Sequence, residues 1–163
     1  MRGADGDMIP EETLKDTFTS FFEGAEPKLR HALVSSFGIE VGREVAADAL
    51  AYGWERWETV RDMDNPIGYL YRVGANRGKK IKRRRRPVDL PPVSAANLPW
   101  VEPGLPEAIG GLSERQRTCV VLLHSLDWRQ TEVAELLGIS VGSVRKHADR
   151  GLEKLQAVLG VDR

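Results

Sequence analysis

Cationic side chains near the C-terminus occur at a spacing that suits contact with nucleic acid. Val144, Ala148 and Leu155 recur at helical intervals, so they predict the inward side of a helix. Ser143, Lys146 and Arg150 then lie on its outward side. An outward helix face of this kind is what enters a DNA major groove. The chemistry that the pattern predicts is therefore the binding of DNA.

A second helix must hold that face in place, and the preceding residues predict one. Val133, Ala134 and Leu137 lie on one side of a short helix, and Gly138 can adopt a positive φ in the turn that follows. Ser140 can cap the next helix. Residues 132–150 therefore predict a helix-turn-helix. Further upstream, Ser113 and Gln116 form a plausible capping box for the helix that carries Cys119 and residues 120–123.

A second cationic cluster lies in residues 64–86, where Asn65 and Pro66 indicate the start of a helix. Ile67, Leu70 and Tyr71 predict its inner side. The opposite side carries Tyr69 with Arg72, Asn76, Lys79, Lys80 and Arg83. Cations neutralise phosphates, and an exposed ring offers a stacking surface worth about 1–3 kcal/mol per base. The alternative is a solvated helix end, but eight of the ten residues from 77 to 86 are basic, which favours a polyanionic partner.

The organisation of the chain predicts an all-α fold of two small helical domains. We expect one domain at 10–86, a proline-rich linker at 87–106 that contains six prolines, and a second domain at 107–160. The 24 basic and 24 acidic side chains balance overall. Residues 1–60 nevertheless hold 6 basic and 12 acidic side chains, whereas residues 61–90 hold 10 and 3. This asymmetry indicates two partners, unless the acidic part serves only solvation.

Residues 41–60 predict one helix between the acidic and the basic parts. Val41, Val45, Ala49 and Tyr52 are expected to face the core. Trp54 and Trp57 have two interpretations: core packing, which is the commoner role, or a face that binds a partner. Nearby carboxylates agree with the second interpretation.

Other classes of function find little support in the sequence. It contains no HExxH, GxxxxGK[ST], GxSxG or CxxC motif, and its three histidines lie far apart, so we expect no catalysis, no cofactor and no metal site. Cys119 falls in an apolar run typical of a core residue. No apolar run approaches the length of a signal peptide or a spanning helix, which predicts a cytoplasmic protein.

Taken in order, these motifs resemble a known family. DALAYGWERW, then NPIGYLYRVGANR with its basic run, the proline-rich segment and a final LSERQRTCVVLLHSLDWRQTEVAELLGISVGSVRKHADRGLEKL are similar to bacterial RNA polymerase sigma factors. The resemblance is to the extracytoplasmic function (ECF) group of the sigma-70 family. It covers nearly the whole chain, in the order region 2 then region 4.

The resemblance implies roles for individual residues. It implies docking on core RNA polymerase by Asp48, Tyr52, Trp54 and Arg56. It implies that residues 61–65 capture a flipped base and that the −10 promoter element is gripped by Asn65, Tyr69, Arg72, Asn76, Arg77, Lys79, Lys80 and Arg83. It implies −35 recognition by Arg129, Ser143, Arg145, Lys146 and Arg150. Around residue 51 the sequence departs from the usual family pattern, with Ala49, Leu50, Ala51 and Gly53.

The expected function is thus that of a promoter-specificity subunit that binds core polymerase and directs initiation by recognising and melting promoter DNA. An anti-sigma factor is a further candidate partner. The alternative is a stand-alone helix-turn-helix repressor or activator that binds operators as a dimer, although the chain has no obvious spare dimerisation helix. A nucleic-acid enzyme is a distant third possibility.

Overall fold

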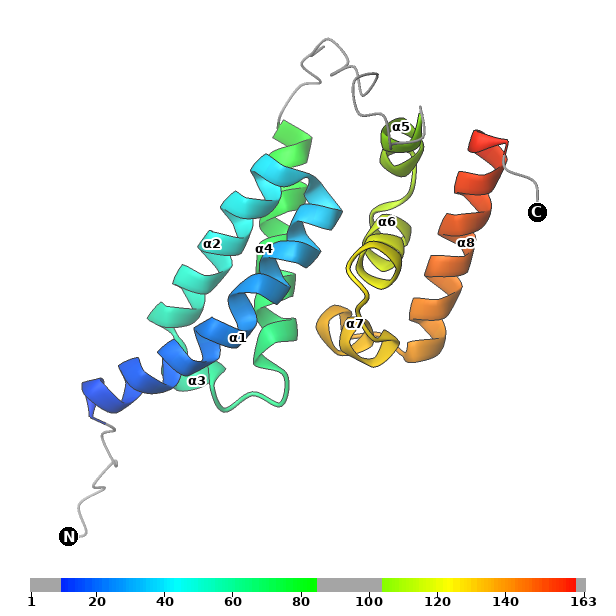
Figure 1. The fold of residues 1–163 in the computed structure, drawn as a ribbon. Helices are drawn as coiled ribbons and strands as arrows, with labels where there is room; N and C mark the ends of the chain where they lie inside the picture. The colour runs from blue at the N-terminus through cyan, green and yellow to red at the C-terminus, as the bar shows by residue number, and fades with distance from the viewer. Residues whose placement is uncertain (1–9, 85–103, 161–163) are drawn as a thin grey trace, which may run out of the picture.

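Two groups of helices follow one another along the chain (Figure 1). The computed structural model describes residues 10–84 and 104–160. The first group contains α1 (Glu11–Phe37), α2 (Ile39–Glu55), α3 (Trp57–Val60) and α4 (Pro66–Arg84). The second contains α5 (Leu105–Gly110), α6 (Glu114–Val120), the π-helical turn η2 (Val121–Ser125), α7 (Gln130–Leu137) and α8 (Val141–Leu159). These ranges contain no strand, and the expected all-α class is confirmed.

In the first group α1, α2 and α4 pack around a common core. Leu29, Leu33, Val45 and Leu70 are fully buried between them. Gly42 lets α2 approach α1 closely, because a Cβ atom there would collide with the backbone of Val34. The burial of one face of α4 leaves its cationic face outward, as the sequence predicts.

The helix expected over residues 41–60 is divided into α2 and α3. Arg56, with φ −122° and ψ 24°, interrupts the helical path. The turn directs Trp57 into the core, where its ring lies 4.9 Å from that of Phe21 and its Nε1 donates a hydrogen bond to Thr17 Oγ1 at 2.9 Å. Tertiary packing of the indole ring therefore overrides the local helical pattern at this point.

In the second group, residues at the ends of the helices set the path of the chain. Ser113 and Gln116 form the predicted capping box at the start of α6. Gly138, with φ 63°, ends α7 in the left-handed conformation that favours glycine. Ser140 Oγ accepts a hydrogen bond from the Ser143 amide at 3.1 Å and caps α8. The turn between α7 and α8 is thus defined by two residues that the sequence identifies.

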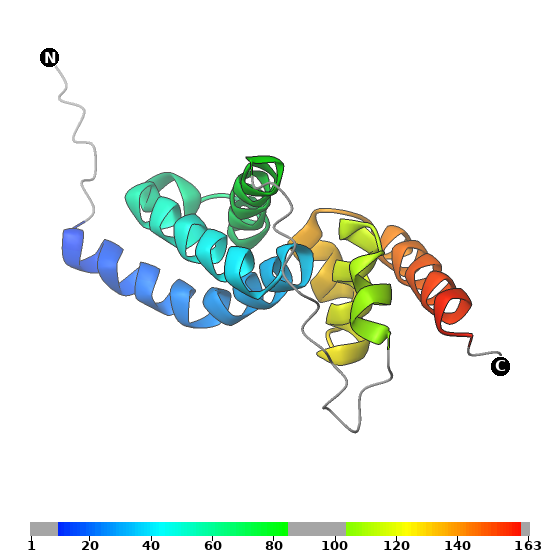
Figure 2. The same cartoon turned by 90° about the horizontal axis from the view of Figure 1, so that it is seen from above.

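The two groups pack against each other through α1 and α6 and through α4 and α7 (Figure 2). Ser36 Oγ lies 2.7 Å from Thr118 Oγ1 and 3.0 Å from the Tyr71 hydroxyl, and all three residues are buried. Arg117 donates from Nε to Ser35 O at 3.0 Å and from Nη2 to Ser36 O at 2.6 Å. These bonds satisfy carbonyls at the C-terminal end of α1, where no further helical turn supplies N–H donors to them. The apolar core is continuous across this contact.

Most of the linker expected at 87–106 lies outside the described residues, as do Arg85 and Arg86 of the basic run. Within the described part, α5 begins at Leu105, and Pro106 occupies its first turn, where the lack of an amide hydrogen removes no helical bond. No helix in residues 10–84 or 104–160 is both long and apolar enough to cross a membrane.

Candidate nucleic-acid interface

The outer face of α4 is the larger of two cationic surfaces. Its exposed members are Arg72, Asn76, Arg77, Lys79, Lys80 and Arg83. The inner face is buried by Leu70, Tyr71 and Ala75, so the helix cannot rotate to hide its charges. Near its C-terminal end Lys82 turns toward the second group instead. Burial and then the nearby charge of Arg117 lower the pKa of Lys82, whose Nζ lies 5.4 Å from the centroid of the Phe37 ring.

Two members of this surface contact α2. The Tyr69 hydroxyl lies 3.1 Å from that of Tyr52, and this hydrogen bond, followed by burial, raises the pKa of Tyr69. Tyr69 is half-buried as a result, whereas the sequence pattern predicts an outward ring. Arg77 Nη1 lies 3.4 Å from Asp48 Oδ2. The residues expected to bind polymerase and those expected to bind DNA therefore touch each other.

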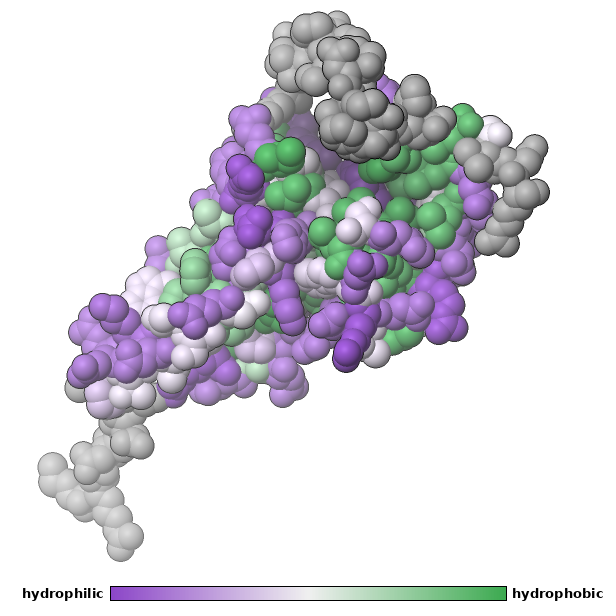
Figure 3. Space-filling model, in the orientation of Figure 1, coloured by the Kyte–Doolittle hydropathy of each residue, from purple (hydrophilic) through white to green (hydrophobic). Residues whose placement is uncertain are grey.

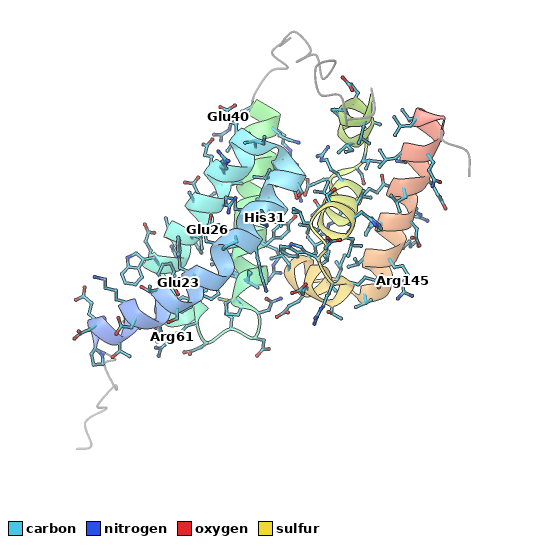
Figure 4. All side chains as sticks on the ribbon, viewed as in Figure 1. Glu23, Glu26, His31, Glu40, Arg61 and Arg145 are labelled. Carbon is cyan, nitrogen blue, oxygen red and sulfur yellow. The ribbon has the colours of Figure 1, made fainter. Side chains whose placement is uncertain are left out.

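The segment between α3 and α4 ends at Asn65, which makes two hydrogen bonds. Its Oδ1 accepts from the Gly68 amide at 2.9 Å and so caps α4. Its Nδ2 donates to Glu135 O of α7 at 2.6 Å. In this arrangement the Asn65 side-chain amide is hydrogen-bonded to α4 and α7 and does not face a nucleotide site. Arg61 lies at the other end of the segment, with its Nε 3.6 Å from Asp62 Oδ1 (Figure 4).

The outer face of α8 forms the smaller cationic surface. Arg145, Lys146 and Arg150 are exposed, and Ser143 is half-buried beside Ser140. Arg145 lies toward the α7 end of α8 (Figure 4), and its Nη2 donates to Gln130 Oε1 at 3.1 Å. Arg129 is exposed just before α7, and its amide donates to Glu132 Oε2 at 2.9 Å. The five residues expected to act together on DNA thus lie at or near the N-terminal halves of α7 and α8.

Arg115 is a cation near this surface that the sequence analysis missed. It is exposed on α6, which packs against α8. Burial, then the charges of Arg115, Arg150 and Lys146, lower the pKa of His147. The helical pattern of α6 alone marks Arg115 as exposed, but only the packing of α6 on α8 brings its charge near the recognition helix.

The four residues expected to bind polymerase do not share one face. Asp48 and Tyr52 lie on the side of α2 that meets α4. Arg56 directly follows α2, and its guanidinium lies 4.3 Å from the centroid of the Tyr52 ring. Trp54 is 43% exposed and points elsewhere, into a groove between α1 and α2 of about 400 Å³ that is also lined by Phe18 and Phe22. Of the two tryptophans, Trp57 is therefore a core residue and Trp54 a surface one.

A second apolar surface lies where α5 and α8 meet (Figure 3). A groove there is lined by Ala108, Leu112, Ala157 and the 69% exposed Val158. Among the described residues no group of three or more His, Cys, Asp or Glu side chains is placed to hold a metal ion.

Comparison with known proteins agrees with this arrangement. Residues 104–155 match the family model described as "Sigma-70, region 4". The chain is 29% identical to an RNA polymerase sigma-E factor of Streptomyces coelicolor over 125 residues, which cover 72% of this chain and 71% of the relative. It is 34% identical to the RNA polymerase sigma factor CarQ of Myxococcus xanthus over 105 residues, covering 58% and 60%.

Two solved structures are similar in fold. One is the sigma factor RpoE of Bartonella quintana in complex with the anti-sigma factor NepR, with a TM-score of 0.58 and 21% identity over 90% of this chain and 99% of that one. The other is CnrH in complex with the cytosolic domain of CnrY, with a TM-score of 0.59 and 25% identity over 91% of each chain.

Two groups of helices that each expose a cationic helix face are typical of a protein that binds DNA. In sequence and in fold the chain is similar to RNA polymerase sigma factors, and its residues 104–155 form a sigma-70 region 4. Its function is to bind core RNA polymerase and direct initiation at promoters.

Proposed function

We propose that the two cationic surfaces divide the recognition of the promoter between them. The α4 surface grips the −10 element through Tyr69 and its exposed cations, and the α8 surface reads the −35 element through Arg145, Lys146 and Arg150. The observation that supports this division is that each helix buries its apolar face and leaves cations outward. Residues 10–86 and 107–160 would then act as separate reading domains joined by the 87–106 segment.

Polymerase contact is proposed for α2. Asp48, Tyr52 and Arg56 present a mixed polar stripe, and Trp54 adds an exposed aromatic ring of the kind that often anchors interfaces. Chemistry at the promoter would belong to the polymerase, and the protein would work in the cytoplasm, where polymerase acts. Because both solved relatives are complexes with a partner, one of them named as an anti-sigma factor, we also propose that this chain has such an inhibitor.

A pull-down with purified core polymerase, followed by run-off transcription, tests the proposal. The full chain should be retained by core polymerase and should direct transcripts from a subset of promoters. The free chain should bind duplex DNA weakly. Tight operator binding by the free chain as a dimer, with neither retention nor run-off product, would support the stand-alone regulator instead.

A further inference from the structure

Two residues of α2 and Arg56, which directly follows it, form a stripe beside α4. Asp48 and Tyr52 are spaced by four residues and so lie above one another on one face of α2, and the guanidinium of Arg56, just beyond the helix, lies over the Tyr52 ring. Asp48 contacts Arg77 and Tyr52 contacts Tyr69, both on α4, while Arg56 contacts the ring of Tyr52. The stripe therefore meets α4 at two residues of the −10 surface.

The contact between Asp48 and Arg77 bears directly on phosphate binding. A guanidinium 3.4 Å from a carboxylate has part of its charge neutralised, so it attracts a phosphate less strongly than a free arginine does. Both side chains are close to half-exposed, at 46% and 44%. An exposed ion pair of this kind is weak and readily exchanges one partner for another. Arg77 can therefore pass from Asp48 to a phosphate without any rearrangement of the backbone.

The contact between Tyr52 and Tyr69 is a second link between α2 and the −10 surface, one helical turn from Asp48. The two rings lie 6.3 Å apart at 42° to each other, and their hydroxyls are hydrogen-bonded. The ring of Tyr69, which the proposed function assigns to the −10 strand, is thus positioned by α2. Any partner that displaces the side chains of this stripe changes the surroundings of Arg77 and Tyr69 together.

We propose that Asp48 is a positioning residue that masks Arg77 in the free protein, and that a cationic side chain of core polymerase takes the place of Arg77 on Asp48. Arg77 is then released toward the −10 strand. The inference rests on the proposed function and deepens it, because docking of polymerase on Asp48 would release Arg77 and so be coupled to capture of the −10 strand. It also gives a physical reason for a free chain that binds DNA weakly.

Binding of the free full-length chain to a fluorescein-labelled dT12 oligonucleotide, measured by anisotropy over a series of salt concentrations, tests the exchange. Asp48→Asn should tighten binding about two- to five-fold at low salt. One additional phosphate contact should steepen the slope of log K against log salt by about 0.7. Glu23→Gln, which removes the same charge from the exposed surface of α1 (Figure 4), is the matched control and should show neither the gain nor the steeper slope.

The gain must depend on Arg77. In the Asp48→Asn background, Arg77→Ala should abolish the tighter binding and return the salt slope to the original value or below. The inference is overturned if Asp48→Asn behaves like Glu23→Gln, or if the gain survives Arg77→Ala. Run-off transcription by the unsubstituted chain distinguishes failure of the proposed function from failure of the exchange. If the chain directs no transcript, the proposed function is contradicted. If it directs transcripts and Asp48→Asn leaves dT12 binding unchanged, only the exchange is contradicted.

Discussion

Two arginines show how surroundings decide what a charged side chain can do. Arg117 donates to the Ser35 and Ser36 carbonyls at the end of α1, which fixes it in the contact between the two groups of helices. Arg77 has one exposed carboxylate partner, so it stays available to a phosphate. Both are helical arginines in sequence. The difference lies in whether the facing groups are buried carbonyls that need a donor or a solvated carboxylate that does not.

On α8, Lys146→Ala and Arg150→Ala should weaken use of the upstream promoter element. Each should cost about 1–3 kcal/mol where a base-edge contact is lost, because the base edge is then left without its hydrogen-bond donor. The measurement is the affinity of the holoenzyme for promoter DNA together with run-off yield. Lys154→Ala removes the same charge from the part of α8 that faces α5 and serves as control. An equal loss with Lys154→Ala would contradict the proposed reading face.

Cys119 is fully buried, and burial raises the pKa of its thiol from 9.0 to about 11. At pH 8 its alkylation by iodoacetamide should therefore proceed no faster than opening of the fold. Because the unfolded chain ionises first, stability should fall as pH rises from about 9 toward 11. Cys119→Ala should lose this part of the pH dependence when urea unfolding is followed across that range. Rapid alkylation of the folded chain at pH 8 would place the thiol at the surface.

At the scale of the helices, close approach matters as much as periodicity. Leu33 and Val45 come from different helices and meet beside Gly74 of α4, where a Cβ atom would lie 2.7 Å from Leu33 Cδ1. Similarly, α1 and α2 meet at Gly42. Small residues at such positions allow backbones to approach in a way that no larger side chain permits.

Gly42→Ala should destabilise the protein by about 1–3 kcal/mol, because the added methyl group meets the immovable backbone of Val34. Gly24→Ala is the matched control: it lies in α1 with nothing within 4 Å of the added Cβ atom. There alanine should stabilise the helix by about 0.5–1 kcal/mol. Urea denaturation midpoints measure both. Stabilisation by both substitutions would show that α1 and α2 do not approach as described.

Residues 10–84 and 104–160 form a closed arrangement, in which the two groups of helices are in contact. The longest helix among the described residues, α1, has 27 residues and is therefore about 40 Å long. Promoter positions −10 and −35 lie about 25 base pairs apart, or roughly 85 Å along B-DNA at 3.4 Å per base pair. The closed arrangement is therefore too short to read both elements. The hydrogen bond from Asn65 Nδ2 to Glu135 O also occupies a residue that is proposed to contact the −10 element. Separation of the two groups should accompany initiation.

Crosslinking the contact tests this expectation. Ser36→Cys with Thr118→Cys, in a Cys119→Ala background, replaces two side-chain oxygens 2.7 Å apart and should oxidise to a disulfide. The oxidised protein should lose most run-off activity with core polymerase, and reduction should restore it. The same protein kept reduced is the control. Undiminished initiation by the fully oxidised form would mean that the contact persists in the active complex.

Much of the local structure could be predicted from the sequence. The cap residues Ser113 and Ser140, the positive φ of Gly138 and the cationic faces of α4 and α8 all follow from rules that act over a few residues. Tyr69 shows the limit of those rules. Its position on the helix was predicted, but its half-buried state follows from Tyr52, which only the packing of α2 on α4 brings near.

What the sequence determined by itself is therefore the set of helices, their ends and the sides on which charge and apolar groups gather, because these depend on neighbours within one or two turns. The tertiary structure alone decided that Trp57 is core and Trp54 is surface, that Asp48 pairs with Arg77, and that Ser36 meets Thr118 from 82 positions away. Such contacts form because burying one apolar face leaves few ways to stack the helices. The partners that meet then depend on the shape of the whole core.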